Sequence, residues 1–294
     1  MKAVAAEIRP AAFSDYVQLT KPRITFLVVI TTLIGFLMAL RGHADLFLLF
    51  NTLVGTGLVA AGASALNMVL EWESDARMRR TEMRPIPSGR LGIPHSIGFG
   101  SAISIIGILQ LLLLVNVLTS FLATLTLGLY LFAYTPLKKR TSLCTLIGAV
   151  PGAIPPMMGW TAVTGSIAFQ AWWLFAILFL WQLPHFLSIA WLYREDYERG
   201  GFPMLPVLDP EGVRTSRQII LETLALILVS VMPSFFGMTG EAYMAGALAL
   251  GCAFLLMGIR LARSKSHAAA RRLLLTSVVY LPLLLTLMVL DRTF

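Results

Sequence analysis

Residues 67–84 read NMVLEWESDARMRRTEMR and follow a long apolar run that begins near residue 46. In a helix, residues four apart lie on one face, so Asn67, Glu71 and Asp75 form a polar stripe that leaves the end of this run. Carboxylates at this spacing repel each other, and ionisable groups beside a membrane span are costly unless they have partners. A divalent cation between the oxygens would remove both costs. We call these three residues the oxygen stripe.

The whole chain has the composition of an integral membrane protein. Of its 294 residues, 57% are hydrophobic and only 13% are charged, whereas about a quarter of the residues in soluble domains are charged. The apolar residues come in runs of about 20, the length of a helix that crosses a bilayer. We therefore expect an all-α, polytopic membrane protein that forms a single domain over residues 1–294 in the lipid bilayer.

Hydropathy predicts nine transmembrane helices. Their approximate positions are 24–40, 46–70, 96–115, 117–135, 142–162, 169–191, 218–238, 242–260 and 272–290. Only the short stretch VNVLT, residues 115–119, divides the third span from the fourth.

Positive charges fall almost entirely on one side of these spans. Of the 23 Lys and Arg residues, 21 lie in the N-terminal tail or in the connections after even-numbered spans, which leaves Arg41 and Arg292 on the other side. The positive-inside rule makes the side with 21 cations cytoplasmic, with the N-terminus inside and the C-terminus outside. Because the net charge of +8 is then a topology signal, we expect no nucleic-acid partner.

The acidic residues gather on the same side. After a cytoplasmic tail, residues 1–22, the long cytoplasmic connections 71–95 and 192–217 hold acidic clusters, whereas the external connections are short and nearly uncharged. Function concentrates in loops that a rigid scaffold holds in place. We therefore expect both connections to be active-site loops.

The oxygen stripe has the ligand chemistry of a magnesium site. One carboxamide and two carboxylates are hard oxygen ligands, and Mg²⁺ typically completes its shell with water and substrate phosphates. Arg77, Arg80 and Arg84 follow the stripe and are suited to bind the oxygens of a diphosphate. The alternative is a helix end in solvent, whose acids and arginines pair only with each other.

A second acidic cluster follows the sixth span. Glu195 and Asp196 would hold a second Mg²⁺ on the same diphosphate, and the adjacent Arg194 adds a cation. The alternative is a capped helix end before a turn at Gly200–Gly201. We predict that Asp196 is a catalytic residue, together with all three members of the oxygen stripe.

A further basic element, YTPLKKR, ends the fourth span. In it, Tyr134 and Lys138 lie one helical turn apart. As a topology signal the element needs no other function, and as part of a phosphate site it supplies cations at the same membrane face.

His185 lies inside the sixth span, directly after Pro184 and within a run of aromatic residues. A buried histidine usually hydrogen-bonds to a neighbouring backbone carbonyl, which is the structural interpretation. In an apolar, aromatic-lined membrane cavity, a histidine is also the axial ligand that an iron porphyrin takes. Both interpretations are open at the level of the residue.

The most specific segments of the chain resemble a known superfamily. They are NMVLEWESDARMRRTEMRPIPSGR (67–90), AYTPLKKRT (133–141) and WQLPHFLSIAWLYREDYERGGFPMLPV (181–207). The chain resembles the UbiA-type intramembrane prenyltransferases along nearly its whole length, and it looks most like the protoheme IX farnesyltransferase branch.

This resemblance implies a bundle of nine helices around a central cavity, with the oxygen stripe as the motif that holds Mg²⁺ and diphosphate. It assigns Tyr134 and Lys138 to the diphosphate and makes His185 a candidate for heme binding. The second acidic motif departs from the D-x-x-x-D pattern of the superfamily, because this chain has Glu195 and Asp196 in REDYERGG instead. Which of the two binds a second metal is therefore open.

The resemblance also implies a reaction. The farnesyl group of farnesyl diphosphate would be transferred to a vinyl group of protoheme IX (heme B), with addition of water, to give heme O and diphosphate. Mg²⁺ would be the cofactor, the bacterial cytoplasmic membrane the location, and a heme A synthase a partner that receives the product.

Two alternatives stay open, the first within the same resemblance and the second from the residues themselves. One is a prenyltransferase whose acceptor is an aromatic quinone precursor. The other is a secondary transporter, because nine spans with a Pro- and Gly-interrupted segment such as GAVPGAIPPMMG (148–159) would suit one. Transporters place their charges near the bilayer midplane and often contain repeats, whereas the acids of this chain cluster at one face.

Overall fold

The computed structural model describes residues 12–293, and within this range nine helical segments are long and apolar enough to cross a membrane. The predicted number of spans is confirmed. The spans are α2 (Pro22–Ala39), α3 (Leu46–Leu70), α5 (Ile93–Leu114), α6–η1–α7 (Val117–Leu137), α8–α9 (Cys144–Thr164), α10 (Phe169–Leu192), α13 (Val213–Phe235), α14 (Glu241–Ser264) and α15 (His267–Leu290). In the described range the only β pairing is an isolated bridge between Thr239 and Arg292.

Two of the last three spans begin earlier than hydropathy predicts. The sequence places their first residues at 218 and 272, whereas α13 begins at Val213 and α15 at His267. Helix starts are set by groups that accept the first backbone N–H bonds, and these lie outside the apolar stretch. Asp209 Oδ2 accepts from Thr215 N at 2.7 Å, and the Ser266 side chain accepts from the first turn of α15.

Four short helices lie outside the spans: α1 (Phe13–Leu19), α4 (Trp72–Asp75), α11 (Arg194–Arg199) and α12 (Leu205–Leu208). The sequence predicted only a tail over residues 1–22, of which 1–11 lie outside the described residues. Helix α1 is joined to the connection after α4 by an ion pair of 2.8 Å between Arg90 Nε and Asp15 Oδ1. The N-terminal segment therefore packs against one of the two predicted active-site loops.

Small residues allow the spans to approach closely. A Cβ atom built on Gly35 of α2 would lie 1.9 Å from the Pro156 carbonyl oxygen of α9, and one built on Gly159 of α9 would lie 1.9 Å from the Thr32 carbonyl oxygen of α2. Helices in lipid associate through such close backbone contacts, because burial from water supplies no driving force there. This crossing fixes α2, and with it the residue that precedes α2, against the rest of the bundle.

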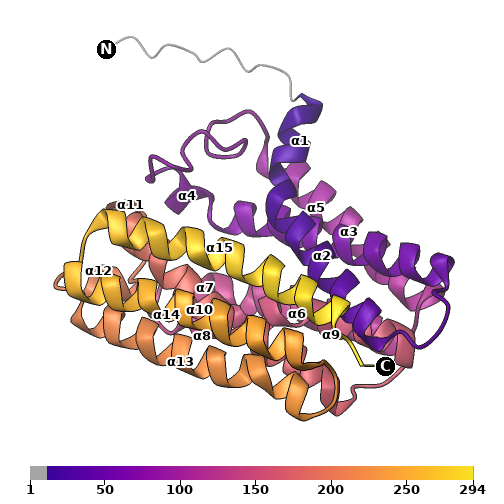
Figure 1. Ribbon diagram of the computed structural model, residues 1–294. Coiled ribbons are helices and arrows are strands. Elements are labelled where there is room, and N and C mark those ends of the chain that lie inside the picture. The colour runs from indigo at the N-terminus through magenta and orange to yellow at the C-terminus, as the bar shows by residue number, and fades with distance from the viewer. Residues whose placement is uncertain (1–11, 294) are drawn as a thin grey trace, which may run out of the picture.

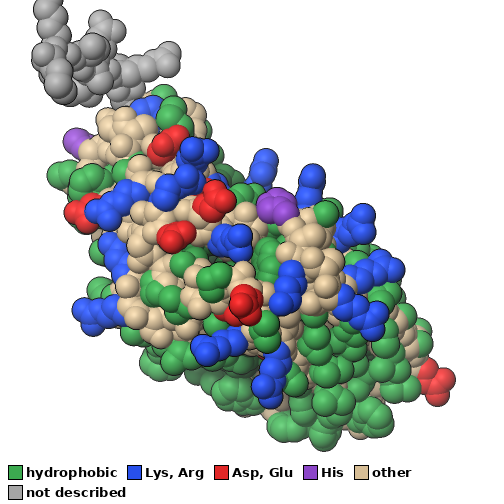
Figure 2. All heavy atoms as spheres, turned by 90° about the vertical axis from the view of Figure 1, so that its left-hand side faces the viewer, with side chains coloured by type: hydrophobic (Ala, Val, Ile, Leu, Met, Phe, Trp, Pro, Cys, Tyr) green, Lys and Arg blue, Asp and Glu red, His purple; other side chains and the backbone are tan. Residues whose placement is uncertain are grey.

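The bundle has one polar end. Helices α4, α11 and α12 lie together at one end of the molecule and the C-terminus lies at the other (Figure 1). The two ends of α2 lie at the two ends of the bundle. At the polar end, Lys21 precedes α2 and donates to Asn67, and at the opposite end Arg292 donates to the Leu37 carbonyl. Figure 2 faces the polar end and shows Lys and Arg side chains gathered there, with acidic side chains among them. Which end faces the cytoplasm stays a prediction.

Candidate active site

The oxygen stripe is buried at the polar end. Helix α3 ends at Leu70 and α4 continues after a kink, yet the backbone bonds from Glu71 N to Asn67 O (3.0 Å) and from Asp75 N to Glu71 O (2.8 Å) keep the stripe on one face. All three residues are at most 2% exposed. A helix end in solvent, the alternative drawn from the sequence, is therefore wrong.

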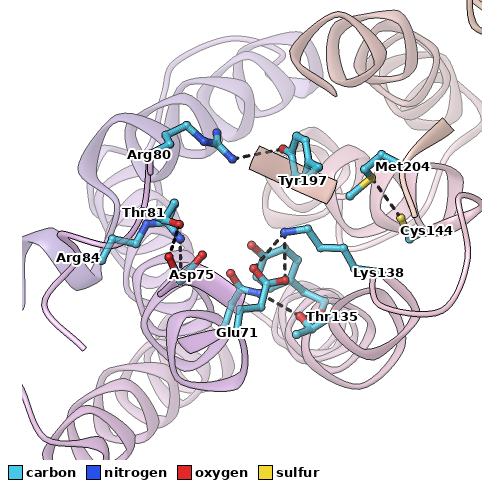
Figure 3. Close-up of polar contacts among 12 residues, drawn as sticks. Glu71, Asp75, Arg80, Thr81, Arg84, Thr135, Lys138, Cys144, Tyr197 and Met204 are labelled. Carbon is cyan, nitrogen blue, oxygen red and sulfur yellow. Dashed lines mark hydrogen bonds and ion pairs between the residues drawn. The ribbon is translucent and has the colours of Figure 1, made fainter. Parts of the chain in front are cut away.

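Each member of the stripe contacts a different basic side chain. Figure 3 shows two of these contacts, between Glu71 and Lys138 and between Asp75 and Arg84. The contacts are 2.8 Å from Lys21 Nζ to Asn67 Oδ1, 3.0 Å from Lys138 Nζ to Glu71 Oε2 and 2.6 Å from Arg84 Nη1 to Asp75 Oδ2. The three cations come from the start of α2, the end of α7 and the connection after α4. The fold thus brings three basic side chains from separate segments to one set of oxygens.

The buried ion pair of Glu71 and Lys138 keeps both groups charged. Burial by itself raises the pKa of Glu71, but the cations Lys138 and Lys21 outweigh burial and hold this pKa below its usual value. Burial also lowers the pKa of Lys138, and the Glu71 carboxylate outweighs it and raises the pKa above its usual value. Among residues 12–293, no carboxylate is in direct contact with Lys21, and burial together with the nearby Arg84 and Lys138 lowers its pKa to about 8.

One carboxylate oxygen of the stripe is still available to a cation. Asp75 Oδ1 is buried and has no hydrogen-bond partner among the described residues, although Oδ2 of the same carboxylate is paired with Arg84. A buried carboxylate oxygen without a partner is costly, and a cation would remove this cost. Within residues 12–293 no three His, Cys, Asp or Glu side chains surround one point. The fit to Mg²⁺ rests instead on the unpaired Asp75 oxygen and on the hard oxygen donors of Glu71 and Asn67, since Mg²⁺ takes its remaining ligands from water and phosphate.

The connection after α4 packs against α11. Arg79 N donates to Asp196 Oδ1 at 3.2 Å, and the Arg80 guanidinium lies over the rings of Tyr193 and Tyr197, 5.0 and 5.4 Å from their centroids. Arg80 Nη2 also contacts the Tyr197 hydroxyl at 3.4 Å. The structure therefore brings the two predicted active-site loops into direct contact.

The acidic side chains of the second cluster have different partners from those of the oxygen stripe. Asp196 is buried and pairs with Arg199, and although burial raises its pKa, the hydrogen bonds from Arg199 and Arg79 lower it below its usual value. The neighbouring Glu195 is exposed and lines a cavity with Arg79 and Arg194. In this arrangement Asp196 joins the loops, and its role as a metal ligand stays a prediction.

Two of the predicted diphosphate residues lie away from the stripe. Arg77 is exposed, and Arg194 Nη1 contacts the Pro210 carbonyl at 3.5 Å. Within the described chain neither of them hydrogen-bonds to the oxygen stripe. Arg84 and Lys138, by contrast, pair with Asp75 and Glu71, and their role in diphosphate binding stays a prediction.

The fourth span is irregular where it reaches the site. It is an α-helix to Gly128, a π-helix from Leu129 to Tyr134 and a short α-helix from Thr135 to Leu137. π-Helical turns are rare and occur frequently at functional sites. Lys138 follows directly, with Nζ 4.4 Å from the Phe202 ring centroid and 5.9 Å from that of Tyr134. Two aromatic rings therefore flank the ammonium group that pairs with Glu71.

Sequence reasoning missed two partners of the stripe. Lys21 was counted only as a topology cation, and Thr135, whose Oγ1 accepts from Asn67 Nδ2 at 3.0 Å, was not singled out. The signal for Lys21 is a lysine directly before the proline that starts the first span, at the same membrane face as the stripe. Lys21 also has a left-handed backbone, with φ of 46°, which is uncommon for a residue other than glycine.

His185 is held by α15. Its Nδ1 lies 2.7 Å from Ser277 Oγ, and this oxygen lies 2.6 Å from the Leu274 carbonyl. A carbonyl only accepts, so the serine hydrogen goes to Leu274 and Oγ accepts from Nδ1–H. The Trp181 ring stacks on the imidazole at 4.8 Å, and Trp181 Nε1 donates to the Ser277 carbonyl at 2.8 Å. The partner is thus a hydroxyl rather than a backbone carbonyl, and Nε2 has no hydrogen-bond partner within residues 12–293.

Sequence comparison relates this chain to proteins that are already known. The model of the UbiA prenyltransferase family matches residues 28–281. The chain belongs to the UbiA prenyltransferase family. A protein of Solibacter usitatus named protoheme IX farnesyltransferase is 49% identical, over 95% of this chain and 98% of its own. One of Koribacter versatilis with the same name is 46% identical, over 95% and 93%. The family predicted from the three motifs is confirmed.

Solved structures show the same fold. A digeranylgeranylglyceryl phosphate synthase matches with a TM-score of 0.79 over 95% of this chain and 97% of its own, at 16% identity. A UbiA homologue of Archaeoglobus fulgidus, solved with GPP and Mg²⁺ bound, matches with a TM-score of 0.68 over 93% and 99%, at 12% identity. The protein is therefore a multi-pass integral membrane prenyltransferase of the UbiA fold.

Proposed function

We propose that this protein transfers the farnesyl group of farnesyl diphosphate to a vinyl group of protoheme IX, giving heme O and diphosphate. The observation that carries the proposal is the identity of 49% to a protoheme IX farnesyltransferase over nearly the full length of both chains. The buried oxygen stripe and its three cations supply the diphosphate chemistry that this reaction requires. The aromatic quinone precursor is the rival acceptor.

The three cations at the stripe bind and hold the diphosphate. Lys138 and Lys21 have ammonium hydrogens beyond those they donate to Glu71 and Asn67, and Arg84 presents several N–H groups. Fixed cations around the departing diphosphate stabilise the negative charge that grows there as the allylic C–O bond breaks. When bound at the stripe, Mg²⁺ would draw further charge from the phosphate oxygens.

The acceptor half of the reaction needs orientation rather than a protein nucleophile. The terminal vinyl carbon forms the new bond to the farnesyl carbon while diphosphate leaves with the electron pair. Water then adds to the inner vinyl carbon, loses one proton and leaves the hydroxyl group of heme O. An apolar bundle interior excludes other water from the allylic cation until the carbon–carbon bond has formed.

His185 is proposed to orient the porphyrin through its iron. Ser277 binds the Nδ1 side of the ring, so the lone pair of the neutral imidazole is on Nε2, the nitrogen that iron takes as an axial ligand. The stacked Trp181 and the α15 backbone fix the plane of the ring. A fixed ring plane and a free Nε2 are what an axial ligand requires.

The same proposal includes the location and the product's destination. We place the protein in the bacterial cytoplasmic membrane with its polar end in the cytoplasm, where farnesyl diphosphate is water-accessible. The product stays in the bilayer, and a heme A synthase is the enzyme proposed to receive it.

The test is the identity of the product. Purified protein in detergent is given farnesyl diphosphate, heme B and Mg²⁺, and the porphyrin is analysed by mass spectrometry. We expect a heavier, more hydrophobic porphyrin whose added mass equals one farnesyl group plus one hydroxyl group. A parallel reaction replaces heme B by 4-hydroxybenzoate, and prenylation of this acceptor alone would contradict the proposal.

A further inference from the structure

A cavity of about 330 Å³ lies at the polar end between α14 and α15, apart from the oxygen stripe. Three arginines line it, Arg260 and Arg263 from the last turns of α14 and Arg272 from the second turn of α15. Ala268, from the first turn of α15, also lines it. The first N–H groups of a helix have no acceptor within the helix, so the cavity combines guanidinium groups with a helix N-terminus.

In the part of the chain that the structure describes, no carboxylate pairs with these positive charges. No Asp or Glu lines the cavity, and within residues 12–293 none of the three guanidinium groups forms an ion pair. Arg260 Nη1 contacts Met257 Sδ at 3.9 Å. Like charges gathered in one concavity repel each other, and a bound anion would remove this repulsion.

A neighbouring cavity on the other side of the α14–α15 connection shows the contrast. It has a volume of about 360 Å³ and is lined by Lys265 and His267 together with Arg79, Glu195 and Asp196. Its cations therefore face carboxylates of the protein itself. Among the described residues, no carboxylate lines the cavity formed by Arg260, Arg263 and Arg272, so the described chain does not neutralise these three charges itself. This distinguishes the cavity from surface cations that serve only to orient the protein in the membrane.

The surface beyond this cavity is apolar and exposed. Leu256, one turn before Arg260, is 47% exposed, and Leu275 and Val279, one and two turns after Arg272, are 56% and 55% exposed. These positions lie within the membrane spans α14 and α15. A ligand that follows this surface has an anionic head in the cavity and apolar chains along the two helices. We propose that the cavity is a binding site for the headgroup of an anionic phospholipid, which arginines recognise through its phosphodiester.

The test compares two sets of variants with the same change in charge. The first is the triple variant Arg260→Gln, Arg263→Gln and Arg272→Gln. The matched control is Lys139→Gln, Arg217→Gln and Arg271→Gln, three exposed cations of the same polar end that do not line the cavity. Binding of phosphatidylglycerol and phosphatidylcholine to the purified full-length protein is measured by native mass spectrometry. We expect the cavity triple to bind phosphatidylglycerol at least tenfold more weakly, with the control and the phosphatidylcholine signal unchanged.

A second variant separates lipid binding from folding and from charge. Ala268→Leu keeps every arginine and fills part of the cavity, so we expect it to lose the preference for phosphatidylglycerol as well. Equal loss in the cavity triple and the control triple would show a general charge effect and overturn the proposal. The proposal would also be overturned if the protein showed no preference for phosphatidylglycerol but bound inorganic phosphate, and if the cavity triple lost this phosphate binding. The ligand would then be a free anion.

Discussion

Asp75 is the member of the oxygen stripe whose environment is incomplete. One carboxylate oxygen is paired with Arg84, and the other is buried without a partner. We expect Asp75→Asn to lower turnover by a factor of about 10²–10³, the usual loss when one charge-stabilising group is removed, while the protein stays folded. The measurement is the rate of heme O formation as a function of Mg²⁺ concentration, with gel filtration as the control for folding. Near-normal turnover with unchanged Mg²⁺ dependence would remove the metal-binding role.

Lys21 is the partner of the stripe that the structure adds. Its ammonium group contacts Asn67 and, in the described part of the chain, no carboxylate, so its charge is available to a diphosphate. We expect Lys21→Met to raise the KM for farnesyl diphosphate by about 10- to 100-fold, the effect of losing one charged hydrogen bond of about 1.5–3 kcal/mol. Lys21→Arg, which keeps the charge, is the matched variant and should recover most of this loss. If both variants bind farnesyl diphosphate like the unchanged protein, Lys21 serves only to orient the first span in the membrane.

A change at His185 is expected to affect the binding of only one of the two substrates. We expect His185→Ala to weaken the binding of heme B at least tenfold and to leave the binding of farnesyl diphosphate unchanged. Ser277→Ala removes the acceptor for Nδ1–H without removing the imidazole, so it should alter the visible absorption spectrum of bound heme B, which reports the axial ligand. Ser277→Thr keeps the hydroxyl and should restore the spectrum. Unchanged heme affinity and spectrum in His185→Ala would leave the histidine a structural role alone.

At the scale of helices, the crossing of α2 and α9 tests how the site is held. A methyl group at Gly159 would overlap the Thr32 carbonyl oxygen of α2, so Gly159→Ala has to separate the helices. We expect it to destabilise the protein by about 1–3 kcal/mol, the usual cost of overpacking, seen as a lower midpoint of thermal unfolding in detergent. Gly128→Ala is the control, because its backbone is helical and nothing lies within 4 Å of the added atom. Equal midpoints for the two variants would contradict the close crossing.

The helices also show what sequence could and could not predict. Membrane spans follow from local hydropathy, so all nine were predictable. The oxygen stripe was identified from a spacing of four residues, which places its side chains on one face of a helix. The partners of the stripe were not predictable in the same way, because Lys21 and Asn67 are 46 residues apart and Glu71 and Lys138 are 67 apart. Likewise, Arg84 and Arg77 look alike in sequence, and only the turns after α4 direct one toward Asp75 and the other toward solvent. Pairing across the bundle depends on tertiary geometry that no local pattern contains.

The orientation of the bundle in the bilayer is expected to follow from its one polar end. The polar end carries the oxygen stripe and nearly all cations, and moving this many charged groups across a bilayer is unfavourable, so we expect it to face inward. Single cysteines placed at exposed positions of the two ends report this directly: Ser88→Cys in the connection after α4 and Ser166→Cys between α9 and α10. Both are made with the exposed Cys252 replaced by serine. In intact cells a membrane-impermeant maleimide should label Ser166→Cys and should label Ser88→Cys only after the membrane is opened. The reverse pattern would place the diphosphate site outside, where the proposed reaction has no supply of farnesyl diphosphate.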